Sequence, residues 1–463
     1  MRLLALPAAA LLSAATPSDD LAAIAAGAGH PAIRHFRATM SRVVEGRPTE
    51  LTVEQLGATE LVRRCVAGIC AGFWFDGQHR WTFGINEIVL QDADDAATPV
   101  RRTLAAIASY AFAEPAFRSS GGTVTAAGPG RWRVRAAGGA ELVAVVDPPG
   151  RTLRRVETPG GQTLAEYGSE TRAGGATYAL DREGPFEPGR LDAVSVVPGP
   201  LAAPAGPAVT FANDASPLAL TKDAVPIVPC TLAGRAARCL LDTGAQPSAL
   251  ALSFAEALGL EPRGELELLG FGRFLTGMVE SGPLALGAAR FERVRLAVLP
   301  STGGVGFDIA IGADLLGRVR VLLDRRRGIA RIGPPASAPA AGAIPLRIRA
   351  GSPRTTATLD GTTVDALLDT GDQATISLGY AQYREGTPWP LAGRGTARGI
   401  AGADDILRVT IPDVSIGRVR LGRTEATVRR TQDEPHVGVG LWTFCVVELD
   451  EQNGRLRCSP GGG

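Results

Sequence analysis

One short phrase occurs twice in this chain, and its repetition constrains the fold more than any other feature. An apolar run enters Asp-Thr-Gly at residues 239–246 (CLLDTGAQ) and again at 366–373 (ALLDTGDQ). In each copy the apolar residues predict a buried strand, which delivers an aspartate to a tight turn where glycine permits close backbone approach. Two such turns facing each other would bring two carboxylates together.

The repetition extends beyond the turns, which indicates duplication of a whole unit and not a chance tripeptide. Each copy is followed by an apolar segment ending in glycine, an apolar strand, and a glycine-terminated strand before a short helix. These segments lie at 284–287, 294–299 and 309–312 after the first copy, and at 414–417, 419–428 and 437–440 after the second. Each half then ends in a predicted hairpin.

This ordered set resembles the aspartic peptidases of the pepsin and retropepsin kind, over residues 222–458. The resemblance implies a mainly β chain with two retropepsin-like β-barrel lobes that form a pseudo-dimer. Lobe 1 is expected at 221–333 and lobe 2 at 344–463, with a Pro/Ala/Gly-rich linker at 334–343. Whether the lobes pair within one chain or between two chains is open at this point.

The resemblance also implies roles for six residues of the two turns. Asp242 and Asp369 are the expected catalytic carboxylates, supported by Thr243, Gly244, Thr370 and Gly371. Such a pair holds a water between one ionised and one protonated carboxyl, so the two groups must share a proton. The proton losses then belong to the pair, and activity is expected to favour acid conditions.

Glycine-rich stretches at 269–274 and 395–402 lie where this family has hairpins that cover the substrate. Phe271, Phe274 and Ile400 are the expected substrate-binding residues. Beneath such hairpins an extended peptide can bind as an added strand. The expected partner is therefore an extended peptide or protein.

Three features depart from the family pattern or invite another interpretation. Asp372 follows the second Asp-Thr-Gly, where a third carboxylate is expected to raise the pKa of the pair. Residues 438–440 (GVG) stand where lobe 1 has 310–312 (AIG), which predicts looser packing behind Asp369. Asp314 could be taken for a further catalytic acid, but we interpret it as a first-turn or N-cap residue of a short helix.

The region before the repeat predicts a leader and one further domain. Arg2, an apolar run over 3–12 and small residues up to Ala15 predict a signal peptide at 1–15, and thus a periplasmic or secreted protein. Residues 16–200 alternate as in an antiparallel sheet, with helices expected near 31–44 and 100–111, and 201–220 form a linker.

The upstream domain faintly resembles the curved-sheet lipoprotein-carrier fold of bacterial envelope proteins. The resemblance implies a possible apolar ligand. The alternative is a pro-domain that shields the peptidase.

Cysteine and charge patterns bound the environment and the partners. The six cysteines form three close pairs, Cys65/Cys70, Cys230/Cys239 and Cys445/Cys458, which predict local disulfides and an oxidising compartment. A metal site is the alternative. It is disfavoured because the chain has only four histidines, which form no cluster beside the cysteines. The net charge of +1 without a basic run argues against nucleic acid, and no apolar stretch reaches the ~20 residues of a membrane span.

Together these patterns predict an aspartic endopeptidase of the bacterial envelope or exterior, working without a metal or organic cofactor. The alternative is a non-catalytic envelope protein that binds peptide or lipid on a degenerate peptidase fold.

Overall fold

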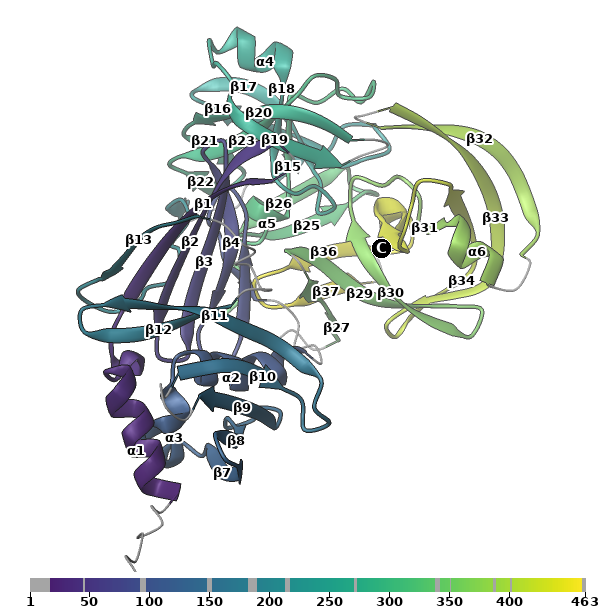
Figure 1. Ribbon diagram of the computed structural model, residues 1–463. Coiled ribbons are helices and arrows are strands. Elements are labelled where there is room, and N and C mark those ends of the chain that lie inside the picture. The colour runs from purple at the N-terminus through teal and green to yellow at the C-terminus, as the bar shows by residue number, and fades with distance from the viewer. Residues whose placement is uncertain are drawn as a thin grey trace, which may run out of the picture.

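The computed structural model describes residues 17–44, 46–91, 97–147, 152–181, 190–212, 217–269, 273–337, 342–349, 351–385, 389–399 and 402–459. The chain is mainly β, with 54% strand and 13% helix, which confirms the mainly β part of the predicted fold class. Figure 1 shows the upstream strands in purple and blue, the first Asp-Thr-Gly half in teal and the second in green and yellow. The predicted signal peptide lies outside the described residues.

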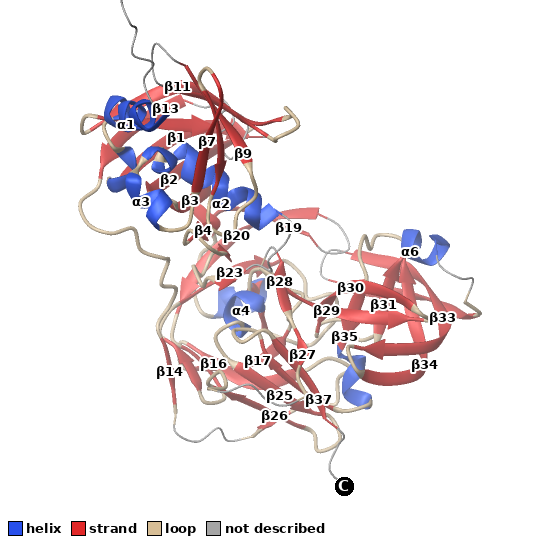
Figure 2. Ribbon diagram, turned by 90° about the horizontal axis from the view of Figure 1, so that it is seen from below, coloured by secondary structure: helices blue, strands red, loops and turns tan. Residues whose placement is uncertain are grey.

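The upstream region consists of two antiparallel sheets with short helices against them, as Figure 2 shows. The seven-stranded sheet has the order β13-β1-β2-β3-β4-β5-β6, formed by β1 (Phe36–Val44), β2 (Arg47–Leu56), β3 (Thr59–Val66), β4 (Ile69–Phe75), β5 (Arg80–Phe83), β6 (Leu90–Gln91) and β13 (Arg190–Val196). The six-stranded sheet runs from β12 to β7, formed by β7 (Thr123–Gly128), β8 (Arg131–Arg135), β9 (Leu142–Asp147), β10 (Thr152–Glu157), β11 (Thr163–Ala173) and β12 (Ala176–Asp181). The helical elements are α1 (Pro17–Ala28), η1 (Pro31–Ile33), α2 (Ala97–Ala108), η2 (Ala111–Ala113) and α3 (Pro115–Ser119).

The helix predicted near 31–44 is wrong, because most of that segment is strand β1. Phe36, Ala38 and Met40 are buried at alternate positions, with exposed fractions of 0, 0 and 7%. A period of two places one face of a strand in the core. The helix predicted near 100–111 is present as α2 and η2.

The first Asp-Thr-Gly half is built on a ten-stranded sheet with the order β14-β22-β21-β16-β17-β24-β18-β23-β20-β19. Its elements are β14 (Val209–Phe211), β16 (Ile227–Leu232), β17 (Arg235–Leu241), β18 (Ala249–Ala251), α4 (Leu252–Ala257), β19 (Arg263–Leu269), β20 (Arg273–Ser281), β21 (Leu284–Leu286), β22 (Ala289–Phe291), β23 (Val294–Leu299), β24 (Ile309–Ile311) and α5 (Ala313–Leu316). We call this half lobe 1.

The second half, lobe 2, is built on an eight-stranded sheet with the order β28-β29-β30-β35-β31-β34-β33-β32. Its elements are β28 (Arg347–Arg349), β29 (Ser352–Leu359), β30 (Thr362–Asp369), β31 (Ile376–Gly379), α6 (Tyr380–Glu385), β32 (Leu391–Gly399), β33 (Gly402–Ile416), β34 (Val419–Arg429), β35 (His436–Gly438) and η3 (Val439–Thr443). The strand that ends at Asp-Thr-Gly is parallel to its neighbour in both lobes, β17 to β24 and β30 to β35.

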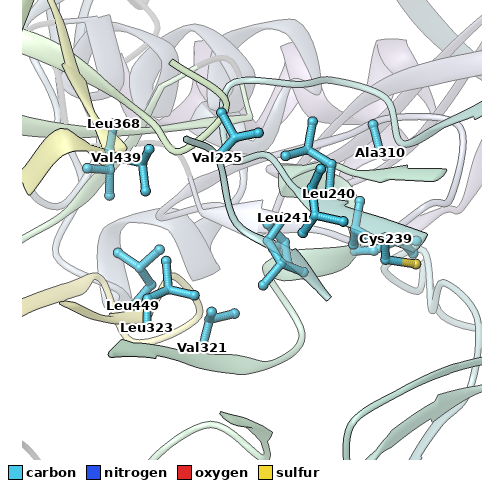
Figure 3. Packing of buried hydrophobic residues seen from close by; sticks show 14 of the residues in the cluster. Val225, Cys239, Leu240, Leu241, Ala310, Val321, Leu323, Leu368, Val439 and Leu449 are labelled. Carbon is cyan, nitrogen blue, oxygen red and sulfur yellow. The ribbon is translucent and has the colours of Figure 1, made fainter. Parts of the chain in front are cut away.

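A six-stranded sheet joins the two lobes, in the order β15-β26-β25-β36-β37-β27. Lobe 1 contributes β15 (Leu218–Ala219), β25 (Arg320–Asp324) and β26 (Ile329–Gly333), and lobe 2 contributes β27 (Ile344–Pro345), β36 (Val446–Asp450) and β37 (Arg455–Ser459). The central pair β25–β36 is antiparallel and comes from both lobes. One buried apolar cluster also includes both lobes, and Figure 3 shows Leu241, Leu323, Leu368 and Leu449 within it.

Three disulfides connect the pairs predicted from sequence, Cys65–Cys70, Cys230–Cys239 and Cys445–Cys458. Cys65–Cys70 joins β3 to β4, Cys230–Cys239 joins β16 to β17, and Cys445–Cys458 joins the segment before β36 to β37. In the described part of the chain, every helix is too short or too polar to cross a membrane.

Residues 86–90 of the upstream region contact lobe 1 through both hydrogen bonds and apolar side chains. The Asn86 amide donates to the backbone carbonyl of Arg295 at 2.9 Å and to the carboxylate of Asp314 at 2.7 Å. Its carbonyl accepts from the Arg295 backbone N–H at 2.8 Å. Ile88 and Leu90 belong to the same apolar cluster as the lobes. The contact is therefore specific, because it satisfies buried polar groups as well as burying apolar surface.

A buried carboxyl at Glu451, directly after β36, predicts a pH-dependent stability. The residue is 3% exposed, and neither carboxylate oxygen has a hydrogen-bond partner among the described residues. Burial, with smaller contributions from the charges of Asp314 and Asp450, raises its pKa to about 8. The folded state therefore keeps a proton that the unfolded chain releases at lower pH. Stability is full below the unfolded pKa and falls as pH rises towards 8, by at most roughly 1.4 kcal/mol per pH unit.

We expect Glu451→Gln to unfold like the unmodified chain near pH 4 and to be more stable by roughly a few kcal/mol at pH 8. Denaturant unfolding at both pH values measures the difference. Glu425→Gln, on the exposed face of β34, is the control. A stability difference that is the same at both pH values would contradict the buried, protonated state of Glu451.

Candidate active site

The two predicted aspartates occupy matching positions at the ends of buried strands. Leu241 pairs with Ile311 at the end of β17, and the Asp242 backbone N–H donates to the Ile311 carbonyl at 2.9 Å. At the end of β30, Asp369 pairs with Gly438 of β35. The chain turns immediately afterwards, so each carboxyl emerges from a rigid sheet at the junction of the lobes.

The two threonines hold the turns together through reciprocal hydrogen bonds. The Thr243 hydroxyl donates to the Leu368 carbonyl at 2.6 Å, and the Thr370 hydroxyl donates to the Leu241 carbonyl at 2.7 Å. Each hydroxyl also accepts from the backbone N–H of the other threonine at 3.0 Å. Both residues are buried, with 1% and 3% exposed. The bonds cross from one lobe to the other, and they fix the separation of the two aspartates.

Thr370→Val is expected to lower the free energy of unfolding by about 2–4 kcal/mol, because valine leaves the Leu241 carbonyl and the Thr243 N–H buried without partners. Urea unfolding measures this loss. Thr370→Ser keeps the hydroxyl and is the matched control, expected to lose much less. Equal losses for valine and serine would show that the methyl group and not the hydrogen bonds stabilises the junction.

The two glycines allow the turns to face each other closely. A Cβ atom on Gly244 would lie 2.4 Å from the carboxyl carbon of Asp369, and one on Gly371 would lie 2.5 Å from that of Asp242. Each carboxyl therefore lies against the opposite turn. Within each turn, one carboxylate oxygen accepts two backbone N–H groups, at 3.1 and 3.1 Å for Asp242 and at 2.9 and 3.2 Å for Asp369.

The surroundings shift the pKa values of the two carboxyls in opposite directions. Burial, followed by the charge of Asp369 and a hydrogen bond with it, raises the pKa of Asp242 well above 3.8. Burial also raises the pKa of Asp369, but contacts with His436, Asp242 and Arg429 outweigh it and lower that pKa below 3.8. Between these two pKa values the pair has one protonated and one ionised carboxyl, as general acid–base chemistry requires.

Asp372, which the sequence predicts to raise the pKa of the pair, is held in an ion pair and is not among the main influences on the pKa of either carboxyl. The Asp372 side chain is 1% exposed, and one of its oxygens accepts from the Arg429 guanidinium at 2.8 Å. The influences that raise the pKa of Asp242 are burial and Asp369. An ion pair compensates the third carboxylate, because a guanidinium within hydrogen-bond distance offsets its charge.

Sequence reasoning missed His436 and Arg429. The His436 Nδ1 atom lies 3.2 Å from Asp369 Oδ2 and 3.8 Å from Asp372 Oδ2. A signal was available in the repeat, because His436 stands two residues before the glycine that pairs with Asp369.

The prediction of looser packing at 438–440 rested on an incorrect alignment of the lobes. Gly438 and not Gly440 corresponds to Gly312: the two have nearly the same backbone angles, φ −90° and ψ 177° against φ −89° and ψ 178°. Packing there is close, since a Cβ on Gly438 would lie 2.1 Å from the Ala374 carbonyl oxygen. Asp314 therefore corresponds to Gly440. It lies in the first turn of α5 as predicted, and its carboxylate accepts from Ser248 and Asn86.

Two long hairpins extend from the lobes at the positions predicted for substrate coverage. They are β19–β20 in lobe 1 and β32–β33 in lobe 2. Phe274 lies on β20 and is partly buried against the main apolar cluster, while Phe271 and Ile400 lie outside the described residues. The lobe 2 hairpin approaches lobe 1, because a Cβ on Gly303 would lie 2.6 Å from the Gly399 carbonyl oxygen.

Asp369, Asp372 and His436 are close enough to share a cation, with one ligand atom from each within 4.8 Å of the others. Their hydrogen-bonding capacity is already used in part: Asp372 accepts from Arg429, and one oxygen of Asp369 accepts from two N–H groups. A guanidinium beside the cluster also opposes a second cation. We therefore assign no metal to it and treat it as an ion-pair network.

A comparison with known proteins finds a family match that includes the first Asp-Thr-Gly turn. Residues 228–315 match the family model described as aspartyl protease, a segment that contains Asp242 but not Asp369. Among solved structures, a retropepsin-like aspartic protease from Rickettsia conorii is similar, with 19% identity over 25% of this chain and 98% of that chain and a TM-score of 0.21. No curated protein matches the sequence. The family match is confined to residues 228–315, which are the part of lobe 1 around Asp242.

Proposed function

We propose that this protein is an aspartic endopeptidase whose catalytic residues are Asp242 and Asp369. One observation carries the proposal: two Asp-Thr-Gly turns from one chain are joined by four reciprocal hydrogen bonds, with each carboxyl against the opposite glycine. That geometry places two carboxyls of opposite pKa shift beside each other at the junction of the lobes.

The proposed reaction uses each carboxyl in one role. Asp369, ionised, accepts a proton from a water, whose oxygen attacks the peptide carbonyl carbon, while protonated Asp242 donates a hydrogen bond and then its proton to the carbonyl oxygen. The resulting gem-diol collapses as the amide nitrogen takes the proton from Asp369, a gem-diol hydroxyl gives its proton to Asp242, and the C–N bond breaks. Products are a carboxylic acid and an amine, and the proton returns to the pair.

The substrate class follows from the two hairpins. An extended peptide has unpaired N–H and C=O groups on both edges, and hairpin strands can satisfy them as in an added strand. Phe274 on β20 pairs with Leu268 next to the tip of its hairpin and is partly buried, so the exposed part of its side chain is proposed to bind apolar side chains of the peptide. Phe271 and Ile400 keep their proposed substrate-binding roles on the sequence resemblance.

Three disulfides are compatible with a location outside the cytoplasm. We infer a periplasmic or secreted enzyme from them together with the leader-like segment at 1–15. The upstream domain is proposed as a substrate- or ligand-binding module or a pro-domain attached through Asn86.

The test is cleavage of a tryptic peptide mixture by the full chain between pH 3 and 7, followed by mass spectrometry of new termini. The proposal expects internal cleavage that is strongest at acid pH. It is overturned if the folded protein cleaves nothing at any pH, and that result would favour the non-catalytic peptide-binding alternative.

A further inference from the structure

The two lobes differ in chemistry directly behind the catalytic turns, although their strand registers agree. Ala310 pairs with Leu240 and with Ala249 in lobe 1, and His436 makes the equivalent pairs with Leu367 and Ser377 in lobe 2. His436 is therefore the counterpart of an alanine.

The same register extends to the next strand and to the turn. Leu299 lies two residues beyond Ala297, the partner of Ala249, and Arg429 lies two residues beyond Thr427, the partner of Ser377. Ala245 and Asp372 match because each backbone carbonyl accepts from the N–H that follows the glycine shared by both lobes, from Ala313 and from Val439. Lobe 1 thus has alanine, leucine and alanine at the positions where lobe 2 has Asp372, Arg429 and His436.

These three lobe 2 residues form a largely buried network that ends at Asp369. The side chains of Asp372, Arg429 and His436 are 1, 14 and 16% exposed. Arg429 holds Asp372 at 2.8 Å, and the Asp372 carboxylate also accepts from the Ala374 N–H at 3.0 Å. His436 lies between the carboxylates of Asp369 and Asp372, at 3.2 and 3.8 Å. Polar groups replace apolar side chains here at a cost in desolvation, which hydrogen bonds and ion pairs within the network offset.

We propose, on the basis of the function proposed above, that Asp372, Arg429 and His436 are positioning residues that make Asp369 the base and Asp242 the acid of the pair. A symmetric pair would share its proton between two equal sites, but here the lobes are made unequal by three polar residues that only lobe 2 has at these positions. The roles of the two carboxyls are thereby assigned before a substrate binds.

The groups around each carboxyl explain the direction of this assignment. Asp369 is approached by Asp242 from the turn after β17, by His436 from β35, by Arg429 from β34, and by the N–H groups of its own turn. Asp242 is approached by Asp369 and by the N–H groups of Gly244 and Ala245, with no cation among these influences in the described part of the chain. The cations near Asp369 favour its ionised form, and Asp242 has no such neighbours among these influences.

Asp372 is needed in this network as an anchor. It fixes Arg429 at the rear and faces His436 with a carboxylate oxygen, so a protonated imidazole would be held between two anions. Without Asp372, Arg429 would lose the carboxylate that holds its guanidinium in this position. The network thus keeps positive charge beside Asp369.

The experiment is a ¹³C NMR titration of carboxyl-labelled aspartate in the full chain, with the Asp369 signal assigned by its loss in Asp369→Asn. In His436→Ala, which introduces the lobe 1 residue, the Asp369 midpoint is expected to rise by about one pH unit or more, since an opposite charge within this distance lowers a carboxyl pKa by about one to three units. His30→Ala, which removes an exposed histidine hydrogen-bonded to Glu114 in the upstream region, is the control and should change nothing.

Two further variants separate charge from packing. His436→Gln keeps a hydrogen-bond donor of similar size without a charge, and it should raise the midpoint like His436→Ala. The paired change Asp372→Ala with Arg429→Leu introduces the remaining lobe 1 residues and should raise it as well. An unchanged midpoint in folded His436→Ala and His436→Gln overturns the proposal.

Peptide cleavage gives a separate readout of the proposed function. If the unmodified chain cleaves fluorescent casein, the acid limb of its pH profile should move to higher pH in His436→Ala by the same amount as the NMR midpoint. If the chain cleaves nothing while the midpoint still moves, the peptidase proposal fails and the electrostatic assignment holds. If cleavage occurs and neither the limb nor the midpoint moves, the assignment fails and the peptidase proposal holds.

Discussion

Asp369→Asn is expected to reduce peptide cleavage by at least about a thousandfold, and Asp242→Asn by a similar factor, because each removes one partner of a general acid–base pair. Asparagine has nearly the same shape as aspartate and keeps the oxygen that accepts the two N–H groups of its turn. The change therefore removes the ionisable group while leaving the turn in place. The double variant should be no slower than either single variant, since the two carboxyls act as a unit.

Initial rates on one cleaved peptide at its optimal pH measure this effect. Asp413→Asn is the control, because Asp413 is an exposed lobe 2 aspartate paired only with the surface residue Arg420 in the contacts described here. It should retain full activity. Retained cleavage in either Asp242→Asn or Asp369→Asn would reject that residue as catalytic and would direct attention to another carboxyl or to a contaminating peptidase.

Gly371→Ala is expected to reduce cleavage by about a hundredfold or more, because a misplacement of reacting groups by ~1 Å has an effect of that size. The new Cβ would lie 2.5 Å from the Asp242 carboxyl carbon and 2.5 and 2.6 Å from its two oxygens. The contact is with the reactive group itself, so the Asp242 side chain must move away from Asp369. Gly244→Ala should act in the same way on Asp369, at 2.4 Å.

The matched control is Gly84→Ala, since a Cβ at Gly84 meets nothing within 4 Å. Cleavage rate and thermal unfolding should be measured together on the unmodified chain, Gly371→Ala and Gly84→Ala. We expect Gly371→Ala to lose activity while the protein stays folded, because the clash can be relieved by a side-chain movement. Full activity in Gly371→Ala would show that the two turns lie farther apart in solution than the geometry described here.

The local parts of this fold could be read from the sequence because they depend on neighbouring residues. Apolar runs into Asp-Thr-Gly specify a strand and a tight turn within eight residues, and the cysteine pairs lie 5, 9 and 13 residues apart, within reach of one hairpin. The repeat then located both aspartates, both threonines and both glycines. The same local reasoning failed at 31–44, where helix-compatible residues form β1 because β2 and β13 pair with it on both sides.

The chain's sequence by itself therefore determined the two carboxylate turns, the mainly β class and the disulfide pairs. Only the tertiary structure decided that Arg429 neutralises Asp372, that His436 contacts Asp369, and that Asn86 of the upstream region binds Asp314. These contacts join residues 57, 67 and 228 positions apart. Charge compensation depends on distances of a few ångströms, and such distances are set by strand register and lobe packing, which no local pattern encodes.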